Sequence, residues 1–225
     1  TNQPKDILSF LSEDTNLDVL NKYLSIRYLR SFYTDLDVVL RGIYNLNVSK
    51  LDRDYLDIRD ISLSFNPYSD SKIVTVHKPR RTGKTLLAKV VALYELYRLT
   101  FKSHVKRLKT NLDLKHDDNI STTIYFHHYQ MVEKVACELK EVIEKTKSLK
   151  DKDVSIYLKN RSCTLSINKY EDSNTHPQPL DKTIPSLVIL DEYNEMSDQE
   201  ITCLINRHVG SDFLFIGTKE KEVES

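Results

Sequence analysis

The sequence predicts an α/β fold in which a mostly parallel sheet is flanked by helices. Two stretches indicate this class. The β-type run at 73–77 is followed by a short polar loop and by a helical pattern from Leu86. The run at 187–190 is apolar throughout, as in a parallel strand that is buried on both faces. Strand-type and helix-type segments alternate between these stretches, which favours a sheet with helical crossovers.

Residues 1–60 are predicted to form a helical segment that packs on the core, residues 61–225. Apolar side chains in this segment recur every three or four residues, which is the spacing of one helix face. They include Leu17, Leu20, Leu24, Leu36, Leu40 and Ile43. The segment 64–70 is expected to be a turn-rich approach to the first strand of the core.

The loop after the 73–77 strand ends in Gly83-Lys84-Thr85. A glycine allows close backbone approach, a lysine offers an ammonium to the β- and γ-phosphates of a nucleotide, and a threonine hydroxyl can ligate Mg²⁺. The free N–H groups at the start of the helix point to the same place. The prediction is therefore a phosphate-binding loop, in which Arg81 and Thr82 also contact the nucleotide.

Two acids, Asp191 and Glu192, follow the apolar run at 187–190. The carboxyl ends of parallel strands lie at one edge of a sheet, so both acids are expected beside the loop. Asp191 is assigned to the Mg²⁺ site together with Thr85, and Glu192 to orienting and deprotonating the attacking water. Together the motifs predict a P-loop NTPase of the ASCE, RecA-like class that acts as a Mg²⁺-dependent ATPase on ATP.

Each motif alone has a simpler alternative. Lys78 stands where the usual loop pattern has its first glycine, so a basic turn with a chance Gly-Lys-Thr remains open. The strand at 187–190 can equally end in ordinary surface acids. The β-α pattern between the two motifs favours the nucleotide site, because it places each motif in the structural context that the chemistry requires.

The other segments complete the predicted sheet and its helices. A helical stripe continues from Leu86 to Phe101 and runs into a basic cluster at 102–109, interpreted either as a solvated helix end or as a phosphate-backbone contact. The remaining predicted elements are a strand at 122–126, a helix at 131–143, a hairpin of 154–158 with 163–167, a helix that begins with a capping box at Ser197–Glu200 and ends near Gly210, and a strand at 213–216.

Charge and hydropathy exclude some classes. The chain has 33 basic and 33 acidic residues, so no global field attracts nucleic acid and any such contact must be local. The sequence has no run long enough to span a bilayer and no secretory pattern at its N-terminus, so an intracellular protein without membrane contact is expected.

The segment Pro79-Arg80-Arg81-Thr82-Gly83-Lys84-Thr85 is similar to the phosphate loop of large terminase subunits, the genome-packaging motors of herpesviruses and tailed phages. The stretch Leu190-Asp191-Glu192-Tyr193-Asn194 resembles the herpesvirus-type version of their second motif. The resemblance covers most of residues 72–218. It implies an ATPase domain that drives double-stranded DNA into a preformed capsid.

The resemblance also implies residue roles and partners. Arg80 stands at the position of the arginine that stabilises charge on the γ-phosphate, Arg81 shares that task, and Thr218 matches the coupling residue. Lys84 neutralises charge in the transition state. The implied partners are double-stranded DNA, the capsid portal, the small terminase subunit and further copies of the chain in a ring. The implied location is the infected host cell, in the nucleus for a herpesvirus-type protein and in the cytoplasm for a phage.

Two other functions remain open. A superfamily 2 helicase or remodelling ATPase also pairs Gly-Lys-Thr with Asp-Glu. A nucleotide-fold module without turnover would serve as a scaffold or capsid-docking part. A nuclease, which full-length large terminases carry after the ATPase domain, is not assigned to this sequence, and the chain is interpreted as the ATPase portion of a longer polypeptide.

Overall fold

The computed structural model describes residues 3–15, 36–46, 61–65, 70–168 and 183–219. Seven strands form one sheet, namely β1 (Ile61–Phe65), β2 (Lys72–Lys78), β3 (Ile120–Phe126), β4 (Val154–Lys159), β5 (Ser162–Ile167), β6 (Ile184–Asp191) and β7 (Asp212–Thr218). The helices with defined bounds are α1 (Ile7–Glu13), α5 (Lys84–Arg98), α6 (Lys102–Asn111), α7 (Gln130–Lys145) and α8 (Asp198–Arg207), with the short 3₁₀ helix η2 (Tyr193–Glu195). Residues 36–43 are also helical.

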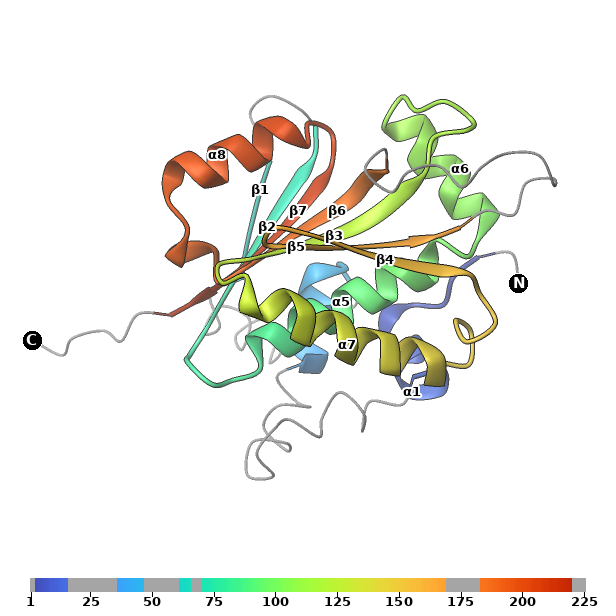
Figure 1. Ribbon diagram of the computed structural model, residues 1–225, viewed down its shortest axis with the longest axis horizontal. Coiled ribbons are helices and arrows are strands. Elements are labelled where there is room, and N and C mark those ends of the chain that lie inside the picture. Colours follow the sequence, from blue (N-terminus) through green and yellow to red (C-terminus); the bar gives the residue numbers. More distant parts are fainter. Residues whose placement is uncertain (1–2, 16–35, 47–60, 66–69, 169–182, 220–225) are drawn as a thin grey trace, which may run out of the picture.

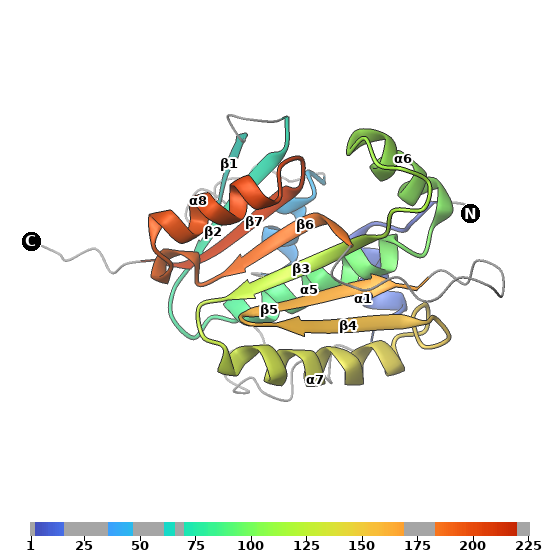
Figure 2. The same ribbon diagram turned by 45° about the horizontal axis from the view of Figure 1, so that its top comes forward.

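Helices cover both faces of the sheet, as predicted for an α/β fold. The strand order is β1-β2-β7-β6-β3-β5-β4. Helices α1, α5 and α7 lie on one face, and α8 lies on the other (Figures 1 and 2). The carboxyl ends of β2, β7 and β6 meet at one edge of the sheet, on the left in Figure 1, because these three strands run parallel.

The sheet is mixed, so the prediction of a mostly parallel sheet is wrong. Its four central strands, β2, β7, β6 and β3, are mutually parallel, whereas β1, β5 and β4 each join through antiparallel pairings. The predicted hairpin of β4 and β5 explains the antiparallel strands on one side of the sheet. Only Asn160 and Arg161 separate β4 from β5, and a connection this short can join only antiparallel strands.

Strand β1 is a second departure from the prediction. Residues 61–65 read Ile-Ser-Leu-Ser-Phe, an alternation of apolar and polar residues that is typical of a half-buried strand. The turn-rich interpretation of 64–70 overlooked this period of two. β1 pairs with β2 in an antiparallel register and thereby covers the outer edge of the strand that leads into the loop before α5.

The helix after the loop is shorter than predicted. Helix α5 ends at Arg98 rather than Phe101, and α6 begins at Lys102. The basic cluster at 102–109 therefore belongs to a helix of its own and does not extend α5. The capping box at Ser197–Glu200 is confirmed, whereas α8 ends at Arg207, three residues before Gly210.

The core consists of two apolar layers, one on each face of the sheet. β6 shows how one strand serves both: Ile189 packs in the layer with α5 and α7, and its neighbours Val188 and Leu190 pack in the layer under α8. All three are fully buried. Burial on both faces explains the uninterrupted apolar run of this strand and confirms its prediction.

The described parts of the N-terminal region pack against α5. The Lys5 N–H donates to the Tyr97 hydroxyl at 3.1 Å, and the Tyr94 hydroxyl donates to the Lys5 carbonyl at 2.8 Å. The Phe10 ring stacks on Tyr97 with ring centroids 4.4 Å apart. Asp6 caps α1 by accepting from two backbone N–H groups of its first turn.

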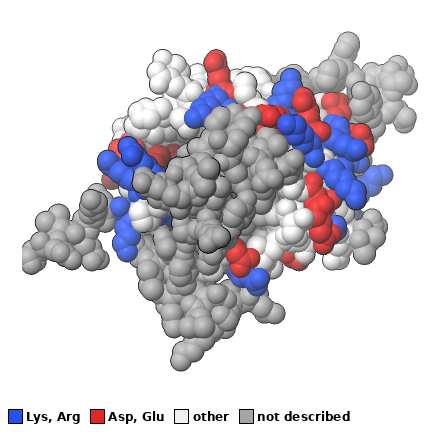
Figure 3. All heavy atoms as spheres, turned by 90° about the horizontal axis from the view of Figure 1, so that it is seen from below, with Lys and Arg blue, Asp and Glu red and all other residues white. Residues whose placement is uncertain are grey.

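Lysine and arginine side chains alternate with aspartate and glutamate on the visible, described part of the face that carries α7 (Figure 3). Within the described residues, none of the helices has the length and apolar character needed to cross a lipid bilayer.

Candidate functional site

The candidate site lies where β2 passes into α5. Gly83 has φ 83° and ψ 29° and serves as the N-cap of α5, in a left-handed conformation that glycine adopts without strain. No side chain caps the first turn of α5, so its N–H groups remain available to an anion. Arg81, at φ 61°, provides a second left-handed turn in the same loop.

The loop folds around the end of Lys84. The Lys84 ammonium donates to the Pro79 carbonyl at 3.4 Å, and the Thr82 hydroxyl donates to the same carbonyl at 2.6 Å. The Lys84 side chain is only 6% exposed. A buried ammonium in a loop of this shape needs negative charge nearby, because burial without a partner is costly.

That charge comes from the end of β6. Lys84 Nζ lies 3.3 Å from Glu192 Oε1, and the Thr85 hydroxyl donates to Asp191 Oδ2 at 2.8 Å. The two sequence motifs, which lie more than a hundred residues apart, therefore meet side by side at the edge of the sheet. This is the arrangement that the sequence predicted for the lysine, the threonine and the two acids.

Asp191 has one carboxyl oxygen without a hydrogen-bond partner among the described residues. The residue is 3% exposed, and the oxygen concerned, Oδ1, is buried. The pKa of Asp191 is raised to about 6, chiefly by burial, which outweighs the lowering effect of the Thr85 hydrogen bond. The nearby Glu192 charge contributes to the rise, and the Lys84 charge opposes it. A bound cation would satisfy the unpaired oxygen and offset the burial.

The donor set fits Mg²⁺. This ion commonly binds proteins through one or two carboxylates, keeps several waters and takes its other ligands from substrate phosphates. Asp191 and Thr85 provide one carboxylate and one hydroxyl, beside a loop suited to phosphate. Within the described residues, no group of three or more His, Cys, Asp and Glu side chains forms a metal site of the all-protein kind.

Glu192 is held by the tip of the neighbouring strand. It adopts φ 57° and ψ 45°, outside the strand conformation, and its Oε2 accepts from the Thr218 hydroxyl at 2.8 Å. The Thr218 N–H donates to Asn194 Oδ1 at 3.1 Å, and the Asn194 amide donates to the Thr218 carbonyl at 3.4 Å. The end of β7 is thus tied to Glu192 and Asn194 through Thr218.

The tip of β7 leaves no space for a side chain at Gly217. A Cβ atom there would lie 2.7 Å from Cε1 of Tyr193, closer than real Cβ atoms approach. The Tyr193 hydroxyl is hydrogen-bonded to His77, the next-to-last residue of β2. Tyr193 therefore connects the ends of β2 and β7 directly behind the acids.

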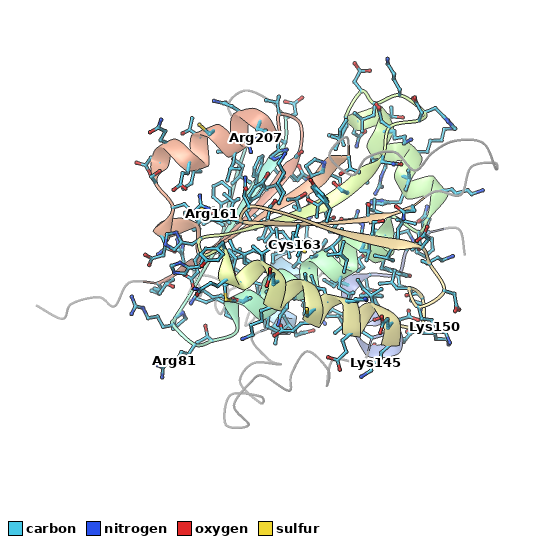
Figure 4. The ribbon with its side chains drawn as sticks, viewed as in Figure 1. Arg81, Lys145, Lys150, Arg161, Cys163 and Arg207 are labelled. Carbon is cyan, nitrogen blue, oxygen red and sulfur yellow. The ribbon has the colours of Figure 1, made fainter. Side chains whose placement is uncertain are left out.

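A cavity of about 250 Å³ opens beside Lys84 and Glu192, between the loop and α7. Both arginines of the loop are exposed, but Arg81 lines this cavity and Arg80 does not. Figure 4 shows Arg81 at the outer bend of the loop. Of the two arginines in the loop, the structure thus brings Arg81 to the cavity beside the acids.

Three residues of the cavity wall were not identified from the sequence: Lys89, Lys134 and Glu138. Lys89 follows Thr85 by four residues and so lies on the same face of α5. Glu138 is 5% exposed and pairs with Lys89. The helical spacing was the available signal for Lys89, whereas the burial of Glu138 depends on α5 packing against α7.

Comparison of the chain with models of protein families, with curated proteins and with solved structures gave no match.

Proposed function

We propose that this chain is the Mg²⁺-dependent ATPase domain of a viral genome-packaging terminase, in which ATP hydrolysis drives translocation of double-stranded DNA into a capsid. One observation carries the proposal. Lys84 and Thr85 of the loop lie within 3.3 Å and 2.8 Å of Glu192 and Asp191. The four side chains are thus close enough to act on one nucleotide, as phosphoryl transfer requires of a phosphate-binding lysine, two Mg²⁺ ligands and a base.

The strand order supports the P-loop NTPase fold of the ASCE, RecA-like class. β7 lies between the loop strand β2 and the acid strand β6, and all three run parallel. The antiparallel strands β1, β4 and β5 extend this core at its two edges and leave the site unchanged.

The residues divide the chemistry between them. Lys84 and the N–H groups of the loop bind the β- and γ-phosphates, and Thr85 with Asp191 holds Mg²⁺. Mg²⁺ supplies the charge that neutralises the phosphate oxygens. Glu192 accepts a proton from the attacking water, and Arg81 or Arg80 adds positive charge at the γ-phosphate.

Lys84 and Glu192 neutralise one another before nucleotide binds. A phosphate that takes the Lys84 ammonium releases the Glu192 carboxylate, which then keeps its contact with Thr218. Nucleotide binding would thus free the Glu192 carboxylate to act as the general base. Thr218, on the tip of β7, is the proposed coupling residue, because it is the part of that strand that contacts the base.

The sequence resemblance alone is the basis for the proposed partners: double-stranded DNA, the capsid portal, the small terminase subunit and a ring of further copies. It is also the basis for the proposed location, the nucleus or the cytoplasm of an infected host cell. The equal numbers of basic and acidic residues mean that DNA contact depends on local groups of cations.

The test is the rate of ATP hydrolysis with and without double-stranded DNA. The full chain is expected to hydrolyse ATP faster with DNA. Glu192→Gln should keep ATP binding and lose about 100-fold or more in rate, because the general base is removed. Glu195→Gln is the matched control, since Glu195 is an exposed acid three residues away.

Three outcomes would contradict the proposal. Parental turnover in Glu192→Gln would remove its general base. ATP binding without any turnover, with or without DNA, would favour the scaffold module. Unwinding of a forked duplex by this chain would favour the helicase.

A further inference from the structure

A second pocket, of about 370 Å³, lies on the face of the sheet opposite to α5 and α7. Its floor includes Thr123 and Tyr125 of β3, which flank Ile124, a residue of the α5 layer. Successive side chains of a strand point to opposite faces, so the two floor residues face the α8 side. The pocket therefore lies between α8 and the β4–β5 hairpin, separate from the loop site.

Three cations surround this pocket: Lys159 and Arg161 from the hairpin, and Arg207 from α8. Figure 4 shows Arg161 at the hairpin turn and Arg207 towards the far end of α8. Arg161 is fixed in place, since it pairs with Glu200 and donates to the His127 carbonyl at 3.1 Å. The Arg161 side chain therefore forms one fixed side of the pocket.

Glu200 is the one carboxylate in the lining, and it is committed to Arg161. The hydrogen bond from the Ser197 N–H and the hydrogen bond from Arg161 lower the pKa of Glu200 to about 2, so it stays ionised at neutral pH. Among the described residues, neither Lys159 nor Arg207 has a carboxylate within salt-bridge distance. Two positive charges of the lining thus remain for a ligand.

The helical spacing places the charges of Glu200 and Arg207 on the same side of the pocket. Glu200 and Arg207 are seven residues apart, two turns of α8, so both lie on the face that borders the pocket. Arg207 also contacts the Tyr125 hydroxyl, which lowers the pKa of Tyr125 against the larger raising effect of burial.

The rest of the lining is made of rings and hydroxyls. Tyr125 is hydrogen-bonded to His208 at 2.9 Å, and the hydroxyls of Thr123 and Thr164 lie 2.9 Å apart. Burial, with the charge of Arg207, lowers the pKa of His208 to about 4, so this ring is neutral at pH 7. Tyr157 adds a partly exposed ring beside Lys159.

We propose that this pocket binds a nucleoside phosphate, either free or as part of a single strand. Lys159 and Arg207 bind the phosphate, and the ring of Tyr157 offers a face on which a base can stack. The volume lies in the range of small-molecule sites. This site does not depend on ATP hydrolysis at the loop, so each proposal can fail without the other.

The experiment measures binding of a fluorescein-labelled single-stranded oligonucleotide to the full chain by fluorescence anisotropy, with thymidine monophosphate as competitor. Arg207→Ala and Lys159→Ala should each weaken binding about tenfold. Each should reduce the salt slope by about 0.7, the value for one lost phosphate contact on a single strand. Arg207 and Lys159 are exposed, so both variants should fold.

Two controls locate the binding. Lys150→Ala removes the same charge from an exposed residue in the turn after α7 and should have no effect (Figure 4). Lys84→Ala removes the lysine of the loop site and should also leave oligonucleotide binding unchanged. Full loss of binding in Lys84→Ala, or equal binding by Arg207→Ala and Lys150→Ala, would overturn the proposal.

The competitor separates the two sources of the phosphate. If thymidine monophosphate displaces the oligonucleotide, a free nucleotide is sufficient as the ligand of the pocket. If only unlabelled oligonucleotide displaces it, the ligand is a single strand. Absence of binding by both probes would also overturn the proposal.

Discussion

At the scale of single residues, the burial of Asp191, the proposed Mg²⁺ ligand, lowers the folding stability of the chain at neutral pH. Its pKa rises from 3.8 to about 6 because the carboxyl group is buried. A group with a raised pKa binds its proton more tightly in the folded chain than in the unfolded one. Folding stability therefore falls as pH rises from about 4 to about 6 and stays low above that range.

Asp191→Asn should remove this pH dependence and stabilise the nucleotide-free chain by on the order of 1–3 kcal/mol at pH 7. The physical reason is that the buried charge is absent while the hydrogen bond from Thr85 can persist. Urea unfolding at pH 4.5 and pH 7 measures the effect. Asp151→Asn, at an exposed residue, is the control. A variant less stable than the parent at pH 7 would refute this reasoning.

Gly217 is the second position where one residue decides the geometry. Gly217→Ala should destabilise the fold by about 1–3 kcal/mol, because the new methyl group would overlap the Tyr193 ring. The double variant with Tyr193→Ala should recover part of that loss, since the overlapping ring is gone. Thermal unfolding of the four members of this cycle checks the coupling, and strictly additive effects would contradict it.

At the scale of elements, one buried ion pair joins the helix of the loop to its neighbour. Lys89 of α5 pairs with Glu138 of α7, and their side chains are 7% and 5% exposed. Lys145 and Glu141, one turn apart on α7, form an exposed pair for comparison. Burial makes the first pair costly to break and leaves the second nearly neutral.

Glu138→Gln should therefore destabilise the chain by about 1–3 kcal/mol, because it removes the carboxylate that accepts from the buried Lys89 ammonium. Lys89→Met combined with Glu138→Leu should recover most of that loss. The control Glu141→Gln should cost no more than about 0.5 kcal/mol. Chemical denaturation gives all three values, and equal costs at the buried and the exposed pair would contradict the argument.

The elements also show which features a sequence reveals. Strand β6 and the capping box of α8 follow from local patterns, and both are confirmed. Strand β1 was missed although its alternation is regular, because flanking turn residues dominated the interpretation. The break between α5 and α6 was not predictable from periodicity, since the apolar stripe continues through Leu99 and Phe101.

At the scale of the whole molecule, the pairing of strands that are far apart in the sequence decides features that local sequence patterns do not predict. The sequence predicted that Lys84, Thr85, Asp191 and Glu192 would share one edge of the sheet, and the structure brings them together. It could not predict that antiparallel strands would extend the sheet at both sides. It also could not place Arg81, rather than Arg80, at the cavity, because that depends on the turn of the loop.

The central claim is that the loop and the two acids form one site for ATP and Mg²⁺. Isothermal titration of ATP into the full chain, with Mg²⁺ and with a chelator, tests it most directly. We expect Mg²⁺ to tighten binding in the parent chain and to give no such gain in Thr85→Val. Lys84→Ala should weaken binding at least about 100-fold, as expected when a charge-assisted contact to phosphate is lost. Parental affinity in Lys84→Ala, or an undiminished effect of Mg²⁺ in Thr85→Val, would contradict the claim.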